Sequence, residues 1–382
     1  MKLTFRQQIA QFRHVLAGQL FPVLEEELGG LEDRARALIT TLELIPLARF
    51  VPSARGWVGR PCKDRLAIAN AFVAKAVYGL ATTRQLIERL HQDEQLLQIC
   101  GWTTVRQIPH ESTFSRAFAE FAIMELPQFV HEALIVATQQ GRLIGHIARD
   151  STAIEARERF PQRPRARQRQ QAAETGQKRG RPAGTGGPHR RHKGGKPPYQ
   201  PKANTRLHRQ RSLQLSQMLE ELPRDCSLGV KTSAEGHQKY WRGYKLHLDV
   251  ADGQIPITAL LTSASLHDSQ AAIPLATITA RRVTNLYDVM DTAYYATEIL
   301  EHSRELGHVP IVRAPRRREG RELSWAEADR LRERTMVERV YGRLKDEFGG
   351  RNIRVRGARK VMAHLMFGVL ALSADQILKL VK

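Results

Sequence analysis

Apolar residues recur at three- and four-residue spacing through residues 1–140, where runs of β-branched residues are scarce. This spacing is typical of amphipathic helices. It predicts one helix over residues 63–78 and another over residues 83–90, the second capped by Thr82 or Thr83. The first 140 residues are therefore expected to be helical.

A turn-like stretch precedes residues 109–121, which read PHESTFSRAFAEF. Ser112 or Thr113 could cap a short helix that carries Arg116. Two interpretations fit this pattern: a helix-turn-helix that places Arg116 against DNA, and a plain helical bundle without base contacts.

The pattern changes to strands beyond the helical region. Residues 143–149, LIGHIAR, predict a short buried strand that ends at Asp150. Residues 243–250 alternate apolar and polar side chains, and Asp252-Gly253 is a strong turn signal. Residues 255–264 then supply the second strand of a hairpin.

Helices and strands alternate in the rest of the chain. The expected elements are a helix over 269–280, a strand over 285–290 that leads to Asp291, a helix over 296–306, a strand over 308–314, and helices over 324–348 and 359–380. This is the order of an α/β, RNase H-like core, a mixed sheet flanked by helices. The apolar stretch 365–381 contains Asp375 and Lys379, so it predicts a core helix rather than a membrane span.

Positive charge is concentrated in one segment of the chain. The 382 residues carry a net charge of +21, and residues 157–211 hold 17 Lys and Arg against two acids. Without apolar periodicity, this segment is expected to be disordered when alone and to bind a polyanion. The predicted organisation is a helical N-terminal DNA-binding region (1–140), a catalytic domain (141–156 and 226–382) and a basic insertion or linker (157–225).

The cysteines and the first residues of the sequence indicate in which cellular compartment the protein is expected. The three cysteines show neither metal-ligand spacing nor a disulfide framework. The first residues lack the apolar run of a signal peptide. We therefore expect a cytoplasmic protein.

Two acidic residues follow predicted strands of the core. Asp150 and Asp291 stand where ligands gather at the edge of an open α/β sheet. Carboxylates placed in this way can hold Mg²⁺, and two such ions support phosphodiester cleavage.

A third acid, Glu338, lies on a predicted helix. Arg334, Tyr341 and Lys345 are spaced so that they share one helical stripe with Glu338. The stripe fits exposed ion pairs such as Arg334–Glu338. It fits equally a metal-binding carboxylate between two cations that hold DNA phosphates.

Five segments resemble the DDE transposases of bacterial insertion sequences, in that family's order, over about residues 66–380. They are RDSTAIEA (149–156), GYKLHL (243–248), SLHDSQ (265–270), MDTAYYA (290–296) and VERVYGRLK (337–345). The subgroup with a Tyr-Arg-Glu-Lys signature is the most similar, although Leu331 stands at the position of its Tyr.

The resemblance implies an RNase H-like core in which Asp150, Asp291 and Glu338 are catalytic and bind two Mg²⁺ or Mn²⁺ ions. Arg334 and Lys345 match the signature and would hold phosphates. The family has an inserted β-rich domain before the helix that carries the catalytic Glu. Only 46 residues separate Asp291 from Glu338 in this chain, which is too few for such a domain. The insertion of this chain instead follows Asp150, and it is basic.

Further candidates for DNA contact lie outside the acidic trio. Arg179 and Arg181, in RGRP, resemble the core of an AT-hook, which binds the minor groove; non-specific phosphate contact is the alternative. Lys245 in the GYKLHL segment and Arg116 complete the DNA-binding set. His267-Asp268 resembles a family motif beside the active site, and either a catalytic or a core role fits the histidine.

We therefore expect a bacterial insertion-sequence transposase, associated with the nucleoid. It would bind element ends as a homodimer on double-stranded DNA, cut them, and join the 3′-OH to target DNA. No membrane partner and no small-molecule substrate are expected. A related nuclease without strand transfer and an inert, transposase-derived DNA-binding protein are the alternatives.

Overall fold

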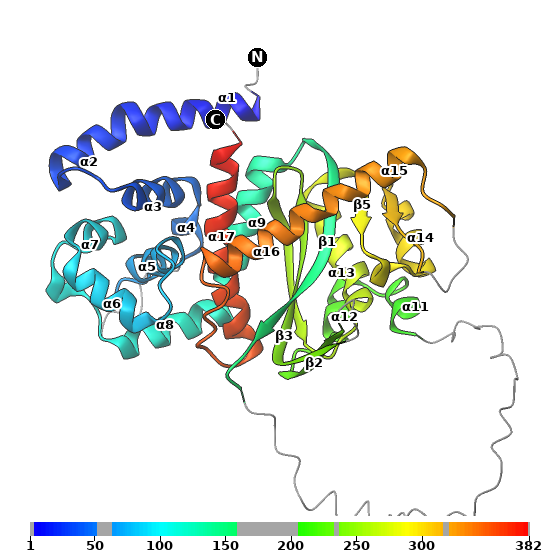
Figure 1. Ribbon diagram of the computed structural model, residues 1–382. Helices are drawn as coiled ribbons and strands as arrows, with labels where there is room; N and C mark the ends of the chain where they lie inside the picture. The colour runs from blue at the N-terminus through cyan, green and yellow to red at the C-terminus, as the bar shows by residue number, and fades with distance from the viewer. Residues whose placement is uncertain (1–3, 52–62, 159–204, 233–236, 316–320, 381–382) are drawn as a thin grey trace, which may run out of the picture.

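The computed structural model describes residues 4–51, 63–158, 205–232, 237–315 and 321–380. Helices form the N-terminal part of the molecule, and a mixed sheet flanked by helices forms the rest (Figure 1). The long helix α17 (Ala358–Lys379) lies between the two parts, in contact with both.

The N-terminal part is helical, as predicted. Its α-helices are α1 (Phe5–Val15), α2 (Phe21–Leu28), α3 (Asp33–Leu44), α4 (Leu47–Phe50), α5 (Arg65–Val77), α6 (Thr83–Gln92), α7 (Glu94–Cys100), α8 (Glu111–Ile123) and α9 (Leu126–Gln139). Thr82 caps α6 through its side chain. The expected cap of α8 is wrong: His110 caps it, because its ring Nδ1 accepts the Ser112 backbone N–H (3.2 Å).

Six strands form one sheet within the described residues. They are β1 (Leu143–Glu155), β2 (Ser227–Thr232), β3 (Gln238–Ala251), β4 (Ile255–Ser263), β5 (Thr284–Met290) and β6 (Val309–Val312). The order is β2-β3-β1-β5-β6, and β4 also pairs with β3. Strands β1, β5 and β6 are parallel, whereas β3 is antiparallel to β1, β2 and β4.

Two strand predictions need correction. The first strand does not end at Asp150, because β1 continues to Glu155 through antiparallel pairing with β3. Its apolar run stops at Asp150, but backbone pairing does not require apolar side chains. Strand β2 was not predicted, since its sequence SLGVKT is short and contains glycine.

Order returns earlier than expected after the basic segment. The short helices α11 (Arg206–Gln210) and α12 (Leu215–Glu220) pack against α13 (Ala272–Arg282), whereas ordered structure was expected only from about residue 226. Arg179, Arg181 and the predicted disorder of their segment lie outside the described residues.

Helices cover both faces of the sheet. Helices α13 and α14 (Thr297–Glu305) lie on one face, and α16 (Thr335–Asp346) lies with α17 on the other. The predicted helix over 324–348 is instead three pieces: α15 (Trp325–Arg330), a 3₁₀ turn at Leu331–Arg334, and α16.

Helix α17 is long and apolar enough to cross a membrane by length and composition. Most of its apolar stretch is nevertheless buried against α5, α8, α9 and β4. Phe72, Phe118 and Phe367 form an aromatic cluster in this core, with Phe72 and Phe118 ring centroids 5.0 Å apart. The helix therefore packs as a core element of the described structure.

Candidate active site

Asp150 and Asp291 lie side by side where the parallel pairing of β1 and β5 ends. Arg149 and Met290 are the last paired residues of the two strands, and each acid is the next residue along its chain. Each carboxylate accepts a 2.8 Å hydrogen bond from a backbone N–H one or two residues further on. The sheet thus brings both carboxyl groups to one edge.

Glu338 approaches this edge from α16, linked through Arg334. Arg334 Nη2 lies 2.8 Å from Glu338 Oε1, and Arg334 Nη1 lies 3.6 Å from Asp150 Oδ2. The Glu338 side chain is 53% exposed, but that of Asp150 is only 20% exposed. The guanidinium therefore bridges a buried carboxylate and a solvent-facing one.

The two aspartates are electrostatically unfavourable as an ionised pair. Burial raises the pKa of Asp150 to about 6; a backbone N–H and Arg334 oppose this rise, and Asp291 adds to it. Burial also raises the pKa of Asp291. Both shifts favour the neutral acids, and a cation held between the carboxylates would favour the ionised forms.

Divalent-cation affinity should therefore depend on pH. Below about pH 6 Asp150 gains a proton, and a protonated carboxyl cannot bind a metal ion. We expect the Mn²⁺ affinity, measured by calorimetric titration, to fall roughly tenfold per pH unit below pH 6 and to level off above pH 7. The Asp329→Asn variant, altered at an exposed acid of α15, should keep the same profile. An affinity that does not change between pH 5 and pH 8 would contradict this assignment.

A fourth carboxylate, Asp268, lies near Asp150 and Asp291. Its charge raises the pKa of both Asp150 and Asp291, so it is close to each. Lys245 Nζ donates to Asp268 Oδ1 (2.8 Å) and to the backbone oxygen of Leu266 (2.8 Å). Lys245, predicted to contact DNA, is thus paired within the site, with its side chain 13% exposed.

The His267-Asp268 pair of the SLHDSQ segment is the signal in the sequence for this carboxylate, although a role was predicted only for the histidine. His267 Nδ1 accepts the backbone N–H of Ser269 (3.4 Å) and contacts its hydroxyl (2.8 Å). His267 therefore caps the 3₁₀ turn Asp268–Ala271.

Tyr341 does not share the exposed stripe of Glu338, contrary to expectation. Its side chain is buried, and its hydroxyl donates to the backbone oxygen of Asp150 (2.6 Å). The same hydroxyl accepts the backbone N–H of Leu248 (3.1 Å). Helical spacing predicts on which side of the helix the Tyr341 side chain lies. It does not predict that the sheet packs against that side and buries the ring. Tyr341 thus fixes α16 to β1 and β3 beside Asp150.

Removing this hydroxyl should weaken the fold and the site together. In Tyr341→Phe the buried N–H of Leu248 loses its partner, which costs about 1–3 kcal/mol. We expect a lower free energy of unfolding in urea titrations and a lower rate of DNA cleavage. Tyr240→Phe is the control for stability, since Tyr240 is exposed. Equal stability of the two variants would show that Tyr341 does not fasten the helix.

The remaining cations that were predicted to bind DNA lie at different distances from the carboxylates. Lys345 Nζ donates to Thr152 Oγ1 (2.6 Å), two residues beyond Asp150 on β1. Arg116 is exposed on α8, which lies in the helical N-terminal part and away from the catalytic edge (Figure 1). The structure thus groups Lys345, but not Arg116, with the acidic residues.

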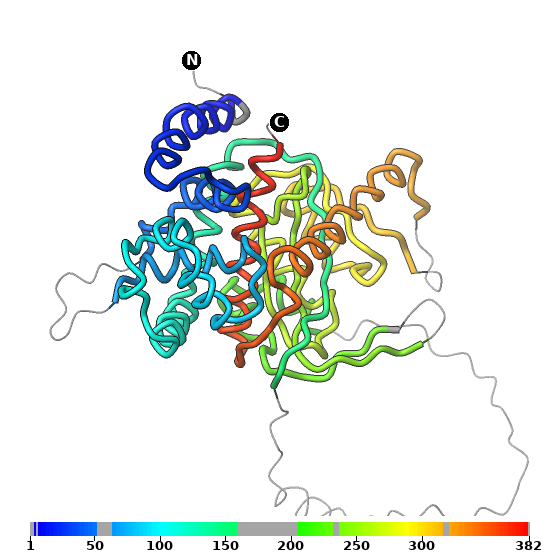
Figure 2. The backbone as a smooth tube through the Cα atoms, turned by 60° about the vertical axis from the view of Figure 1, so that its left-hand side comes forward, coloured from blue at the N-terminus to red at the C-terminus, as the bar shows by residue number. Residues whose placement is uncertain are grey.

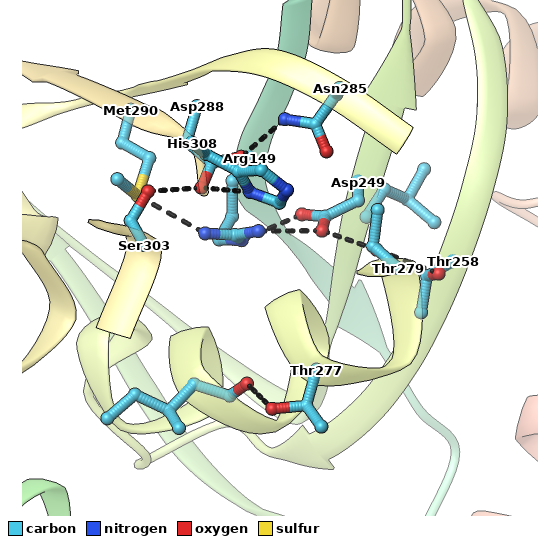
Figure 3. A network of polar contacts seen from close by, with 12 residues as sticks. Arg149, Asp249, Thr258, Thr277, Thr279, Asn285, Asp288, Met290, Ser303 and His308 are labelled. Atoms are coloured by element: carbon cyan, nitrogen blue, oxygen red, sulfur yellow. Dashed lines mark hydrogen bonds and ion pairs between the residues drawn. The ribbon is translucent and has the colours of Figure 1, made fainter. Parts of the chain in front are cut away.

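A buried polar network begins at Arg149, the residue before Asp150 on β1 (Figure 3). Arg149, only 1% exposed, donates two 2.8 Å hydrogen bonds to Asp249. Burial alone would raise the pKa of Asp288, but His308 and the charge of Arg149 lower it. Because Arg149 precedes Asp150, this network holds the backbone from which that acid extends.

The donor set of the site fits a hard divalent cation. Carboxylate oxygens are the ligands that Mg²⁺ and Mn²⁺ prefer. Tyr294 Oη, buried near Asp150 and Asp291, finds no hydrogen-bond partner among the described atoms, so a polar group bound beside it would satisfy this hydroxyl. No three His, Cys, Asp or Glu side chains of the described chain are already grouped as a metal site.

Comparison with known families agrees with this architecture. Residues 144–374 match the family model described as Transposase DDE domain, and residues 24–120 match the one described as Transposase domain (DUF772). The first match covers more than half of the chain, so the protein belongs to the DDE transposase family. No curated protein and no solved structure matches it. Membership implies a metal-dependent, nucleic-acid-processing enzyme with DNA as its partner.

Proposed function

We propose that this protein is the transposase of a bacterial insertion sequence, which binds the element ends, cleaves them and joins each 3′-OH to target DNA. The observation that carries the proposal is the meeting of Asp150 and Asp291 at one sheet edge, with Glu338 linked to them through Arg334. The strand order supports an RNase H-like core: β1, β5 and β6 are parallel, and β3 and β4 are antiparallel.

Asp150, Asp291 and Glu338 are the residues that would hold two Mg²⁺ or Mn²⁺ ions. Such ions, when bound, activate the attacking oxygen and stabilise the leaving oxygen. In cleavage, water attacks the phosphorus and the 3′-oxygen leaves as a 3′-OH. In joining, that 3′-OH attacks a target phosphorus and displaces another 3′-oxygen.

The cations beside the carboxylates would position the DNA. Arg334 neutralises Asp150 and Glu338 in the free protein, and we propose that it turns to a DNA phosphate once the carboxylates bind metal ions. Lys345, next to Thr152, would contact a neighbouring phosphate. Asp268 would keep Lys245 fixed beside the site, which makes both of them positioning residues.

The finer features of the protein belong to the same proposal. Arg334, Glu338 and Lys345 support the Tyr-Arg-Glu-Lys subgroup, with Leu331 as its departure. The basic insertion with Arg179 and Arg181, together with the N-terminal helices that carry Arg116, would hold more of the duplex. We further propose a homodimer on DNA and a nucleoid-associated location in the cytoplasm.

A nuclease without strand transfer is the alternative that needs a separate test. Labelled element-end DNA, incubated with the protein and Mg²⁺ or Mn²⁺, should yield nicked ends and, with a target plasmid present, joined products. Nicking without joined products would support the nuclease. Binding without either product would support an inert transposase-derived protein.

A further inference from the structure

The outer part of the sheet carries two lysines that face each other. Lys231 on β2 and Lys239 on β3 are directly opposed in the antiparallel pair, and both are exposed. Opposed Cα atoms lie about 4.5–5.5 Å apart. Like charges in this position destabilise a sheet. Within the described part of the chain, neither amine forms a hydrogen bond or ion pair that would offset the repulsion.

More positive charge gathers around this pair. Burial lowers the pKa of Lys345, and Arg351, Lys231 and Lys239 lower it further, so these cations are close together. Arg351 is paired with Asp346 (2.6 Å), and Glu155 is the other acid nearby. Cations brought from β2, β3 and the end of α16 therefore outnumber the acids around them.

This positive surface is continuous with the candidate active site. Lys345 contacts Thr152, two residues beyond Asp150, and β1 ends three residues later, opposite Gly243 of β3. Beyond that point β2 and the first half of β3 continue as a two-stranded ribbon, Ser227–Thr232 and residues 238–243. Figure 2 shows the ribbon, in green, extending from the body at the lower right.

We propose that the β2–β3 ribbon is a DNA-binding arm whose lysine face holds phosphates of the duplex just beyond the cleavage site. The inference rests on the proposed function, because it describes where the duplex lies after it leaves the proposed active site. Phosphates between Lys231 and Lys239 would replace their repulsion with attraction and release counterions. The competing explanation is that these lysines only protect an edge strand from aggregation.

The Lys231→Gln/Lys239→Gln variant separates these explanations. Without DNA it should unfold at a higher temperature than the wild type, because a repulsive pair is lost. With element-end duplex, the slope of log affinity against log salt should decrease by about 1.8, which is on the order of a 50-fold weaker affinity at 0.1 M salt. The KM for DNA in the cleavage reaction should rise by a similar factor.

A control variant removes the same charge elsewhere. Arg281→Gln/Arg304→Gln alters exposed cations of α13 and α14, and it should keep the wild-type affinity and salt slope. Equal losses in both variants would overturn the arm, because net charge alone would explain them. Unchanged affinity in the lysine variant, with or without aggregation, would also overturn it.

The same measurements keep this inference separate from the proposed function. If the wild type binds duplex through the lysines but neither cuts nor joins it, the arm is supported and the transposase assignment fails. If the lysine variant cuts and joins with an unchanged KM for DNA, the arm fails and the transposase assignment is supported.

Discussion

Replacing Asp150 with Asn is expected to abolish DNA cleavage and, at the same time, to stabilise the protein. The neutral amide cannot replace a carboxylate as a metal ligand, so the rate should fall at least roughly 10³-fold, a loss of about 4 kcal/mol in transition-state stabilisation. Asp291→Asn and Glu338→Gln should give losses of the same order. DNA binding should remain nearly intact, because the cations of the surface are unchanged.

The gain in stability follows from the raised pKa of Asp150. Its folded pKa of about 6 lies above its ordinary value, so the ionised carboxylate destabilises the fold at neutral pH. This penalty begins to decrease as the pH falls through 6 and is lost only below the ordinary Asp pKa of about 4. In metal-free buffer at pH 7.5, Asp150→Asn should be more stable by on the order of 2 kcal/mol. At about pH 3, below both the folded and the unfolded pKa, the difference should vanish. Lower stability of the variant at pH 7.5 would contradict this account of the electrostatics.

A cysteine variant tests direct metal contact. Mn²⁺ accepts a sulfur ligand more readily than Mg²⁺ does, so Asp150→Cys should be inactive with Mg²⁺ and partly active with Mn²⁺. The matched control is Asp252→Cys, altered at an acid that instead contacts His146 (3.0 Å) at the other end of β1. A defect in Asp150→Cys that is the same with both metals would argue against Asp150 as a ligand.

The second large effect is expected at Arg149. Its loss in Arg149→Met leaves the fully buried Asp249 without its ion-pair partner, which costs about 3–5 kcal/mol. Arg149→Met/Asp249→Leu should recover much of this loss, since neither charge remains. Arg332→Met, which removes an exposed pair with Asp329, should change stability by less than about 1 kcal/mol.

Urea unfolding of these variants measures the coupling between Arg149 and Asp249. If the free energy of unfolding of the double variant falls by the sum of the losses in Arg149→Met and Asp249→Leu, the two residues are not coupled. The ion pair then does not support the backbone before Asp150. Similar small losses in Arg149→Met and Arg332→Met would lead to the same conclusion.

The sequence predicted the elements that hold the acids better than it predicted their surroundings. Asp291 could be placed because the sequence NLYDVM predicts a strand that stops directly before it. Glu338 could be placed on a helix because Val337, Val340 and Leu344 repeat at helical spacing. Local patterns of this kind depend only on neighbouring residues, so they are visible in the sequence.

Features that depend on distant partners were missed. The extension of β1 past Asp150 is set by pairing with β3, which lies about 100 residues later in the chain. The burial of Tyr341 depends on the backbone groups of Asp150 and Leu248. The pairing of Lys245 with Asp268 likewise arises only when β3 meets the turn after β4. None of these contacts has a local pattern.

The most direct test of the central claim is a structure of the protein bound to element-end DNA with Ca²⁺, which binds carboxylates but commonly does not support catalysis. Asp150, Asp291 and Glu338 should then share the ions at about 2.3–2.6 Å, and Arg334 should have left Asp150 for a phosphate. If Glu338 still points away from both aspartates, or if the ions and the cleavable phosphate lie elsewhere, the proposed catalytic site is wrong.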